Sequence, residues 1–184
     1  MERRGPWTIV GSEIRYQNQW MKVIHYDVIR PDGQIGIYGV AHIHRGAYVL
    51  PLDEEHMVYL TRQFRFPLNC DTVETVSGGI DDGETPLAGA KRELKEELGI
   101  EANQWTHLGH MEPLTSPYLG TQHLFLARQL RFGEAHQEGT ENISLLKVSL
   151  EDAVQMVMES KIIDGPSCTL ILKANEYIRG MSAL

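Results

Sequence analysis

A chain of 184 residues with 42% hydrophobic content can bury one sizeable core but is too short for two full domains. Its formal net charge of −8 repels polyanions, so we expect no nucleic acid partner. No apolar run approaches the roughly 18 residues that cross a bilayer, and no signal-like apolar segment follows the first residues. We therefore expect a soluble, cytoplasmic protein with no membrane partner.

Short β-prone runs open the chain at residues 7–17, 20–29 and 35–43, and Arg30-Pro31-Asp32-Gly33 is typical of a hairpin turn. Further strands are expected at 47–50 and 57–60, separated by a polar turn at 51–56. Several strands before the first long helix favour a mixed sheet. We divide the chain into an N-terminal antiparallel strand unit at 1–45 and a main domain at 46–184.

The central stretch, Gly78–Ile100, combines a glycine- and aspartate-rich turn with an amphipathic helix. Pro86 after Thr85 marks the start of the helix, and Gly99 marks its end. Apolar residues recur at helical spacing and predict one core-facing stripe: Leu87, Ala90, Leu94 and Leu98.

The same helix concentrates acidic residues. Glu93, Glu96 and Glu97 place three negative charges within little more than one turn, on a face that we expect to be exposed. An ordinary solvated face is the alternative, with Arg92 and Glu96 as a common i, i+4 pair. Crowded carboxylates are unfavourable without a cation, and Mg²⁺ prefers carboxylate and carbonyl oxygens. The pattern therefore favours a divalent metal site.

Strands are expected again at 105–112, 122–130 and 143–148, followed by two helices. Ser149 and Asp152 form an N-cap pair for a helix that reaches about Glu159. Asp164 precedes a terminal helix that begins at Gly165-Pro166. Cys70 and Cys168 form neither a metal motif nor a disulfide framework.

The central stretch also carries a family resemblance. It reads Gly78, five residues, Glu84, seven residues, Arg92-Glu93-Leu94, one residue, Glu96-Glu97, one residue, Gly99-Ile100. This resembles the Nudix box at every specified position. The resemblance implies an α/β (α+β) fold: a Nudix-type α/β/α sandwich around a mixed β-sheet, with the N-terminal strand unit added.

The resemblance also implies roles for residues of the box. Glu93 and Glu97 would be direct ligands of Mg²⁺, with Mn²⁺ as the alternative ion, and the Ser77 carbonyl and Glu96 would complete the cluster. Glu84 and Arg92 are expected to pair and hold the loop against the helix. Gly78 and Gly99 have structural roles.

Substrate-binding residues are expected outside the box. Arg65, in Gln63-Phe64-Arg65, resembles the arginine that meets substrate phosphate in nucleoside diphosphate sugar hydrolases. Arg62 is a second candidate, with an ordinary edge charge as its alternative role. Trp20, with Trp7 and Tyr16, is a candidate for a base-stacking wall. Tyr118 is a further substrate-binding candidate, because its distance beyond the box suits the alternative of a dinucleoside polyphosphate substrate.

Two loops bear on substrate and catalysis. Ser116-Pro117 lies where ADP-ribose and sugar-nucleotide pyrophosphatases carry a proline, although residues 118–123 depart from the glycines and acidic residue that follow it there. In the resembled subfamily, the loop matching residues 133–142 supplies a glutamate that acts as the base. Glu141 fits best and Glu138 is the runner-up, with Glu96 as a further catalytic candidate.

The implied activity is Mg²⁺-dependent hydrolysis of a nucleoside diphosphate linked to a sugar, giving a nucleoside monophosphate and a sugar phosphate. ADP-ribose or a hexose nucleotide such as GDP-mannose fits as the small-molecule partner. Relatives with such an N-terminal unit are commonly homodimers. The alternatives are hydrolysis of dinucleoside polyphosphates or oxidised nucleoside triphosphates, and a non-catalytic nucleotide-binding regulator, whose usual mark is a degraded box.

Overall fold

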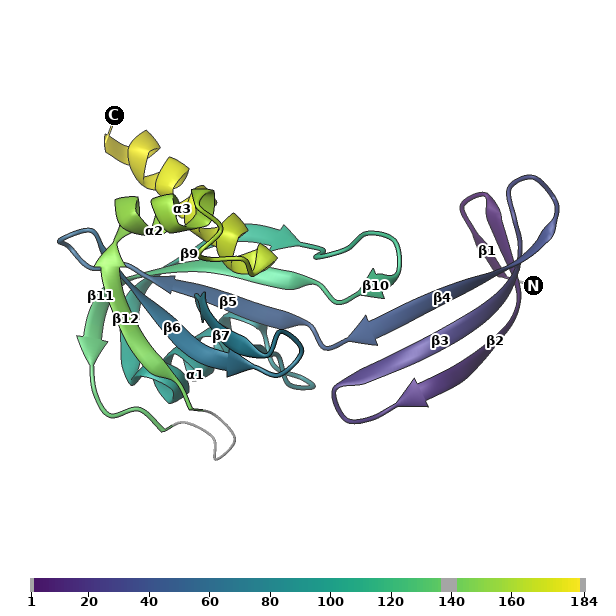
Figure 1. The fold of residues 1–184 in the computed structure, drawn as a ribbon, viewed down its shortest axis with the longest axis horizontal. Helices are drawn as coiled ribbons and strands as arrows, with labels where there is room; N and C mark the ends of the chain where they lie inside the picture. The colour runs from purple at the N-terminus through teal and green to yellow at the C-terminus, as the bar shows by residue number, and fades with distance from the viewer. Residues whose placement is uncertain (1, 137–141, 183–184) are drawn as a thin grey trace. The chain divides into compact units, whose positions relative to one another are not determined.

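A computed structural model describes residues 2–136 and 142–182 of the chain, which form two compact units (Figure 1). The first unit comprises Met1–His44 and Glu112–Thr121, and the second comprises Arg45–Met111 and Gln122–Leu184. The loop at 112–121 therefore belongs to the N-terminal unit, although it lies far from that unit in the sequence. No helix among the described residues is both long and apolar enough to cross a bilayer.

The elements of the first unit are all strands. Its sheet has the order β1-β2-β3-β4-β10, with β1 Glu2–Arg4, β2 Trp7–Gln17, β3 Met21–Ile29, β4 Ile35–Ile43 and β10 Tyr118–Leu119. The hairpin turn predicted between β3 and β4 is confirmed, since the Gly33 N–H donates to the Arg30 carbonyl at 2.9 Å. Gly33 has a φ of 82°, which favours glycine.

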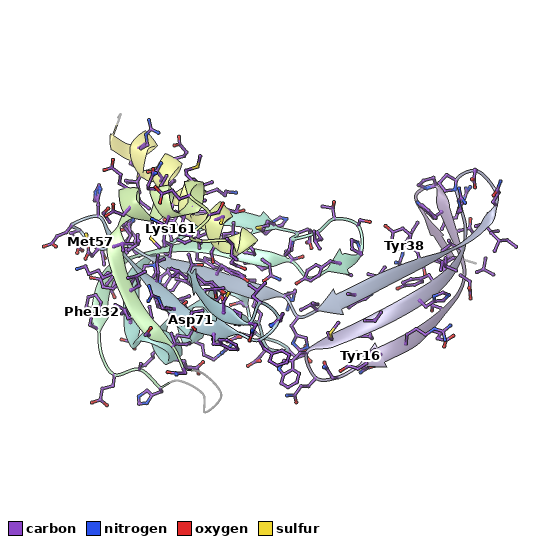
Figure 2. The ribbon with its side chains drawn as sticks, viewed as in Figure 1. Tyr16, Tyr38, Met57, Asp71, Phe132 and Lys161 are labelled. Atoms are coloured by element: carbon purple, nitrogen blue, oxygen red, sulfur yellow. The ribbon has the colours of Figure 1, made fainter. Side chains whose placement is uncertain are left out.

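The loop at 112–121 adds β10 to this sheet as a parallel partner of β4, with Tyr118 opposite Ala41. The Ala41 N–H donates to the Pro117 carbonyl at 2.8 Å. Tyr38, which is labelled on β4 in Figure 2, donates from its hydroxyl to the Ser116 carbonyl at 3.2 Å. Sequence periodicity did not reveal β10, because a two-residue strand has no period to detect.

The second unit contains two sheets. The larger has the order β8-β5-β11-β9, with β8 Val76–Gly79, β5 Gly46–Pro51, β11 Gln122–Phe132 and β9 Ile100–Met111. It is mixed, because β5 and β11 run parallel while the other neighbours are antiparallel. The smaller sheet is antiparallel, with the order β12-β6-β7: β12 Ser144–Ser149, β6 Met57–Arg65 and β7 Cys70–Glu74.

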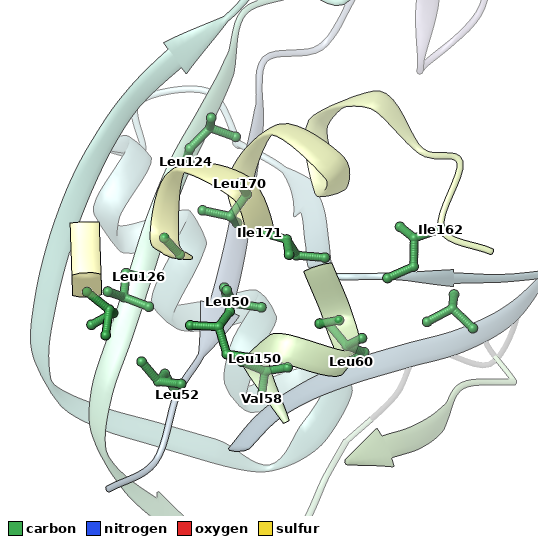
Figure 3. Packing of buried hydrophobic residues seen from close by; sticks show 14 residues of the cluster. Leu50, Leu52, Val58, Leu60, Leu124, Leu126, Leu150, Ile162, Leu170 and Ile171 are labelled. Carbon is green, nitrogen blue, oxygen red and sulfur yellow. The ribbon is translucent and has the colours of Figure 1, made fainter. Parts of the chain in front are cut away.

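Helices cover both faces of the larger sheet, which confirms the predicted sandwich. They are α1 Pro86–Leu98, α2 Leu150–Met158 and α3 Gly165–Ser182, with α1 on one side and the other two opposite (Figure 1). Leu50 and Leu124 pack with Leu170 of α3 in one core cluster (Figure 3). Val49 and Phe125, their neighbours in sequence, pack in a second cluster with α1. The alternation follows from side chains of a strand pointing to opposite faces.

The predicted cap of α2 is confirmed, since Ser149 Oγ accepts from the Asp152 N–H at 2.9 Å. The start of α3 is held in a similar way, because Asp164 Oδ2 accepts from the Ser167 N–H at 2.9 Å. Ser167 Oγ in turn accepts from the Thr75 N–H at 3.0 Å. The buried bond between Ser167 and Thr75 fastens the first turn of α3 to the chain between β7 and β8.

Asp53 organises the turn between β5 and β6. Its carboxylate accepts from the Met57 N–H at 2.8 Å and the Tyr59 hydroxyl at 2.8 Å, and it lies 3.1 Å from Lys147 Nζ. Burial raises the pKa of Asp53, but these hydrogen bonds outweigh it and leave the pKa below its ordinary value.

We expect Asp53→Asn to lower the free energy of unfolding by about 1–3 kcal/mol at pH 7, because it weakens bonds to a carboxylate. Since the folded-state pKa lies below 3.8, this stabilisation is complete above pH 3.8 and is lost as the pH falls through the folded-state pKa. Urea unfolding at pH 7 and near pH 3 measures it. Asp32→Asn, at an exposed ion pair with Arg30, is the control; a loss for Asp53→Asn that did not shrink in acid would contradict the assignment.

Candidate active site

The box forms a loop and a helix with defined ends. The Thr85 hydroxyl accepts from the Ala88 N–H at 3.2 Å, Pro86 opens α1, and Gly99 closes it with a φ of 64°. Any side chain at Gly99 would meet the Gly133 carbonyl, 2.5 Å from an ideal Cβ. Gly99 therefore provides both the left-handed conformation and the space for the segment after β11 to pass.

Two of the three glutamates on the acidic face of α1 are buried and Glu96 is partly exposed, so the expectation of an exposed face is wrong for Glu93 and Glu97. Glu93 and Glu97 are 9% and 2% exposed. An ideal Cβ on Gly78 would lie 1.9 Å from Glu93 Cδ, so the carboxylate occupies the space that a side chain at Gly78 would fill. The helix lies against β8, and the missing side chain of Gly78 lets Glu93 pack directly on the strand.

Arg92 lies among the carboxylates of the box. It donates from Nη1 to Glu93 at 2.7 Å and to Glu96 at 3.0 Å, and from Nη2 to the Gly79 carbonyl at 2.7 Å. It also donates to Glu84 at 3.2 and 3.3 Å, the pairing expected from the sequence. Burial lowers the pKa of Arg92, but the three carboxylates raise it more. Arg92 thus joins the loop to the helix and compensates charges that burial would otherwise disfavour.

The donor chemistry of this face fits a hard divalent cation. Carboxylates of Glu93, Glu96 and Glu97 and backbone carbonyls of β8 are the oxygen ligands that such ions prefer. In the part of the chain that the structure describes, no three His, Cys, Asp or Glu side chains already converge as a metal site. Glu93 and Glu96 both accept from Arg92 Nη1, so the guanidinium occupies the space between these two carboxylates.

A pocket of about 510 Å³ is lined by residues of β5, β6 and β7 and by the start of α3. Arg65 lines it and pairs with Glu74, donating from Nε to Oε1 at 2.9 Å and from Nη2 to Oε2. The hydrogen bonds to Glu74 raise the pKa of Arg65 most, and the negative charge of Glu97 adds to the effect. Arg65 therefore lies within electrostatic reach of the box helix.

The structure assigns the other predicted residues to different places. Trp20 and Tyr118 belong to the N-terminal unit, and Arg62 is exposed on β6 opposite Ser144. The Ser77 backbone lies on β8, opposite Tyr48 of β5.

The two loop glutamates proposed as the base, Glu138 and Glu141, lie outside the described residues. Before them, the His136 N–H donates to the Glu96 carbonyl at 2.9 Å. The segment that leads to these glutamates therefore contacts the C-terminal end of α1.

Two pocket residues were missed from the sequence. Glu74 is 4% exposed and binds both Arg65 and the Thr72 hydroxyl, whose Oγ1 donates to Oε1 at 2.6 Å. Strand β7 was not predicted, so nothing marked Glu74 as buried. Asp164 was recognised only as the start of a helix, although it also lines the pocket.

Comparisons with known proteins agree with this geometry. The family profile of the NUDIX domain matches residues 42–161, and that of the nucleoside diphosphate sugar hydrolase N-terminal domain matches residues 7–41. The chain is 33% identical to the methanol dehydrogenase activator of Bacillus methanolicus, over 95% of this chain and 94% of that protein. It is also 33% identical to the ADP-ribose pyrophosphatase of Bacillus subtilis (strain 168), over 86% and 84% of the two chains.

A solved structure has the same fold. The crystal structure of an ADP compounds hydrolase matches with a TM-score of 0.85 and 18% identity, and each chain is covered in full. The fold and the box thus define a hydrolase class that acts through a loop and helix rich in carboxylates. The chain belongs to the Nudix family, and within it resembles the ADP-ribose and nucleoside diphosphate sugar pyrophosphatases.

We expect Gly78→Ala to destabilise the protein by about 1–3 kcal/mol, the cost of overpacking, because its methyl group would displace the buried Glu93 carboxylate. Gly79→Ala is the matched control, since an ideal Cβ there has no atom within 4 Å among the described residues. Thermal unfolding of both variants measures the difference. Equal stability of the two variants would show that Glu93 does not depend on the space at Gly78.

Proposed function

We propose that the protein is a divalent-metal-dependent pyrophosphohydrolase that cleaves ADP-ribose, or a related nucleotide sugar such as GDP-mannose, to a nucleoside monophosphate and a sugar phosphate. The observation that carries the proposal is the combination of the buried box carboxylates with the Arg65 pocket, which is lined by Tyr48, the strand partner of Ser77 at the start of the box. The relative from Bacillus subtilis, named an ADP-ribose pyrophosphatase, supports the choice of substrate.

The box residues would hold the metal ion, which we propose to be Mg²⁺. Glu93, Glu96 and Glu97 would supply carboxylates, and the Ser77 carbonyl a neutral oxygen. When bound, the ion neutralises diphosphate charge and lowers the pKa of a water molecule. Arg92 would keep its contacts with Glu84 and the Gly79 carbonyl, and so hold the loop and helix in register.

Arg65 would bind the substrate diphosphate. Glu74 holds it through Nε and Nη2, which uses two of the five N–H donors of a guanidinium. The planar guanidinium group, with its paired N–H donors, matches phosphate oxygens better than the compact ammonium group of lysine does. A base from the loop at 133–142 stays a prediction.

Removing the charge of a proposed metal ligand tests the site. We expect Glu93→Gln and Glu97→Gln to lower Mg²⁺-dependent turnover of ADP-ribose by about a hundredfold or more, because each loses a carboxylate that would bind the ion. Glu101→Gln, at an exposed pair with Lys95, is the control with the same chemical change.

The assay uses a panel: ADP-ribose, GDP-mannose, a diadenosine polyphosphate and a nucleoside triphosphate, each with Mg²⁺ and with a chelator. Near-normal turnover by either variant at limiting Mg²⁺ would refute that ligand assignment. If only the diadenosine polyphosphate or only the nucleoside triphosphate were hydrolysed, that compound class would replace nucleotide sugars as the proposed substrate. No turnover of any compound would favour a nucleotide-binding regulator.

We also propose that the protein is a homodimer through its N-terminal unit. This unit has large apolar side chains in solvent, including Ile14 and Ile37 on its sheet and Trp20 in the turn between β2 and β3, each more than half exposed. Sheet surfaces of this kind are usually covered. Ile14 lies opposite Ile24, and Ile37 lies opposite Asp27, so they project from opposite faces of the sheet.

Light scattering at micromolar concentration should give twice the mass of one chain. Of Ile14→Asp and Ile37→Asp, we expect one to produce monomers, because a charge in a dimer interface must be desolvated, and the affected residue identifies the buried face. A monomeric wild-type protein would refute the dimer.

A further inference from the structure

The Arg65 pocket has an uneven distribution of charge. Its polar lining comes from Arg65, Glu74, Thr72 and Asp164, while Leu68 and Ile163 contribute apolar surface. Its volume of about 510 Å³ lies within the roughly 300–1,000 Å³ typical of small-molecule sites. The cavity therefore offers a cation, carboxyl groups and an apolar wall to one ligand.

The cation is held in a fixed orientation. Glu74 accepts from Nε and Nη2 of Arg65, and the Thr72 hydroxyl donates to Glu74 Oε1 at 2.6 Å. The side chain of Glu74 is 6% exposed, whereas that of Arg65 is 38% exposed. The buried carboxylate thus anchors one edge of the guanidinium and leaves the side chain accessible from the pocket.

The second charged group is the Asp164 carboxyl. One of its oxygens, Oδ2, accepts from the Ser167 N–H at 2.9 Å and caps the first turn of α3. Burial, more than any other influence, raises the pKa of Asp164, as expected for a carboxyl that lies in a partly dry pocket. A carboxyl group accepts hydrogen bonds from hydroxyl groups, which sugars supply.

We propose that this pocket is the subsite for the sugar-phosphate half of the substrate. Arg65 binds the phosphate, Asp164 accepts hydrogen bonds from the sugar hydroxyls, and Glu74 is a positioning residue that orients Arg65. The proposal rests on the proposed function, which it deepens by assigning one half of the substrate to named side chains. A sugar phosphate combines an anionic phosphate with a sugar rich in hydroxyl groups, and the cavity combines the Arg65 cation with the Asp164 carboxyl group.

The nucleotide half is a poorer match for this pocket. Bases are held most often by stacking on aromatic faces, and Tyr48 is the aromatic residue that lines the cavity. The exposed aromatic side chains Tyr16 and Trp20 belong to the N-terminal unit instead. The Arg65 guanidinium and the Asp164 carboxyl group of the pocket therefore match the sugar phosphate better than the nucleotide.

Binding of the two product halves, measured separately by calorimetry, tests the assignment. Ribose 5-phosphate and AMP are titrated, with Mg²⁺, into the wild-type protein, Asp164→Asn and Glu74→Gln. Asparagine caps helices as well as aspartate does, so Asp164→Asn removes the charge and keeps the start of α3. We expect both variants to bind ribose 5-phosphate about tenfold more weakly, and AMP within about twofold of wild type.

Two further variants separate positioning from folding. Thr72→Val keeps the ion pair and removes one bond to Glu74, so it should weaken ribose 5-phosphate binding in the same direction but less, even if Glu74→Gln unfolds. Glu176→Gln, at the exposed pair with Arg179, is the matched control and should bind like wild type. A positioning role for Glu74 also predicts a raised KM for ADP-ribose with a smaller change in kcat, which a lower fraction of folded protein would not produce.

The outcomes separate the subsite from the proposed function. Weaker AMP binding with unchanged ribose 5-phosphate binding would assign the pocket to the nucleotide half and overturn the proposal. So would absent ribose 5-phosphate binding in the wild type, or binding that Asp164→Asn and Thr72→Val leave unchanged. If ADP-ribose is not hydrolysed but ribose 5-phosphate binding depends on Asp164, the proposed function fails and the sugar-phosphate subsite stands.

Discussion

The second unit depends on balancing the charge of carboxylates that it buries. Glu93, Glu97 and Glu74 are each less than a tenth exposed, and an isolated carboxylate at such depth would be strongly disfavoured. Arginine provides the compensation twice, through Arg92 for the box and through Arg65 for Glu74. Ion pairs therefore constrain α1 against the loop that precedes it, and β6 against β7, in addition to apolar packing.

The two arginines are used differently. Arg92 donates to three carboxylates and a carbonyl, so its guanidinium is occupied by the protein. Arg65 is held along one edge by a single carboxylate. The first arrangement stabilises a loop and helix, whereas the second holds a cation at the wall of a cavity. The number of protein acceptors around each guanidinium distinguishes a structural arginine from one that can meet a ligand.

Local sequence signals predicted the elements that depend on local physics. The start of α1 at Pro86, its end at Gly99 and the Ser149 cap follow from backbone conformations and side chains within a few residues. The pairing of Arg92 with Glu84 was also predicted, but from the resemblance to the Nudix box rather than from a local signal. The alternating strands β2, β3 and β4, in contrast, were predicted because their pattern is local.

The features that were missed depend on distant partners. Nothing near Glu74 in the sequence identifies Arg65 as its partner, because β6 and β7 must pair first. The depth of Glu93 depends on β8, whose Gly78 leaves room for the carboxylate, and so the prediction of an exposed face was wrong. Tyr118 joins the N-terminal sheet only because residues 112–121 return to β4.

Asp164 shows how one side chain can serve both the fold and a ligand. Its Oδ2 accepts a hydrogen bond from the Ser167 N–H in the first turn of α3. Ser167 Oγ in turn accepts from the N–H of Thr75, the residue that follows Glu74. The carboxyl group that lines the cavity and the carboxylate that holds Arg65 are therefore joined through two hydrogen bonds and one peptide unit. A rigid link of this kind keeps two groups at a fixed separation, which a site must do if it recognises two parts of one small molecule. The short buried connection between β7 and β8 thus matters for recognition as well as for stability.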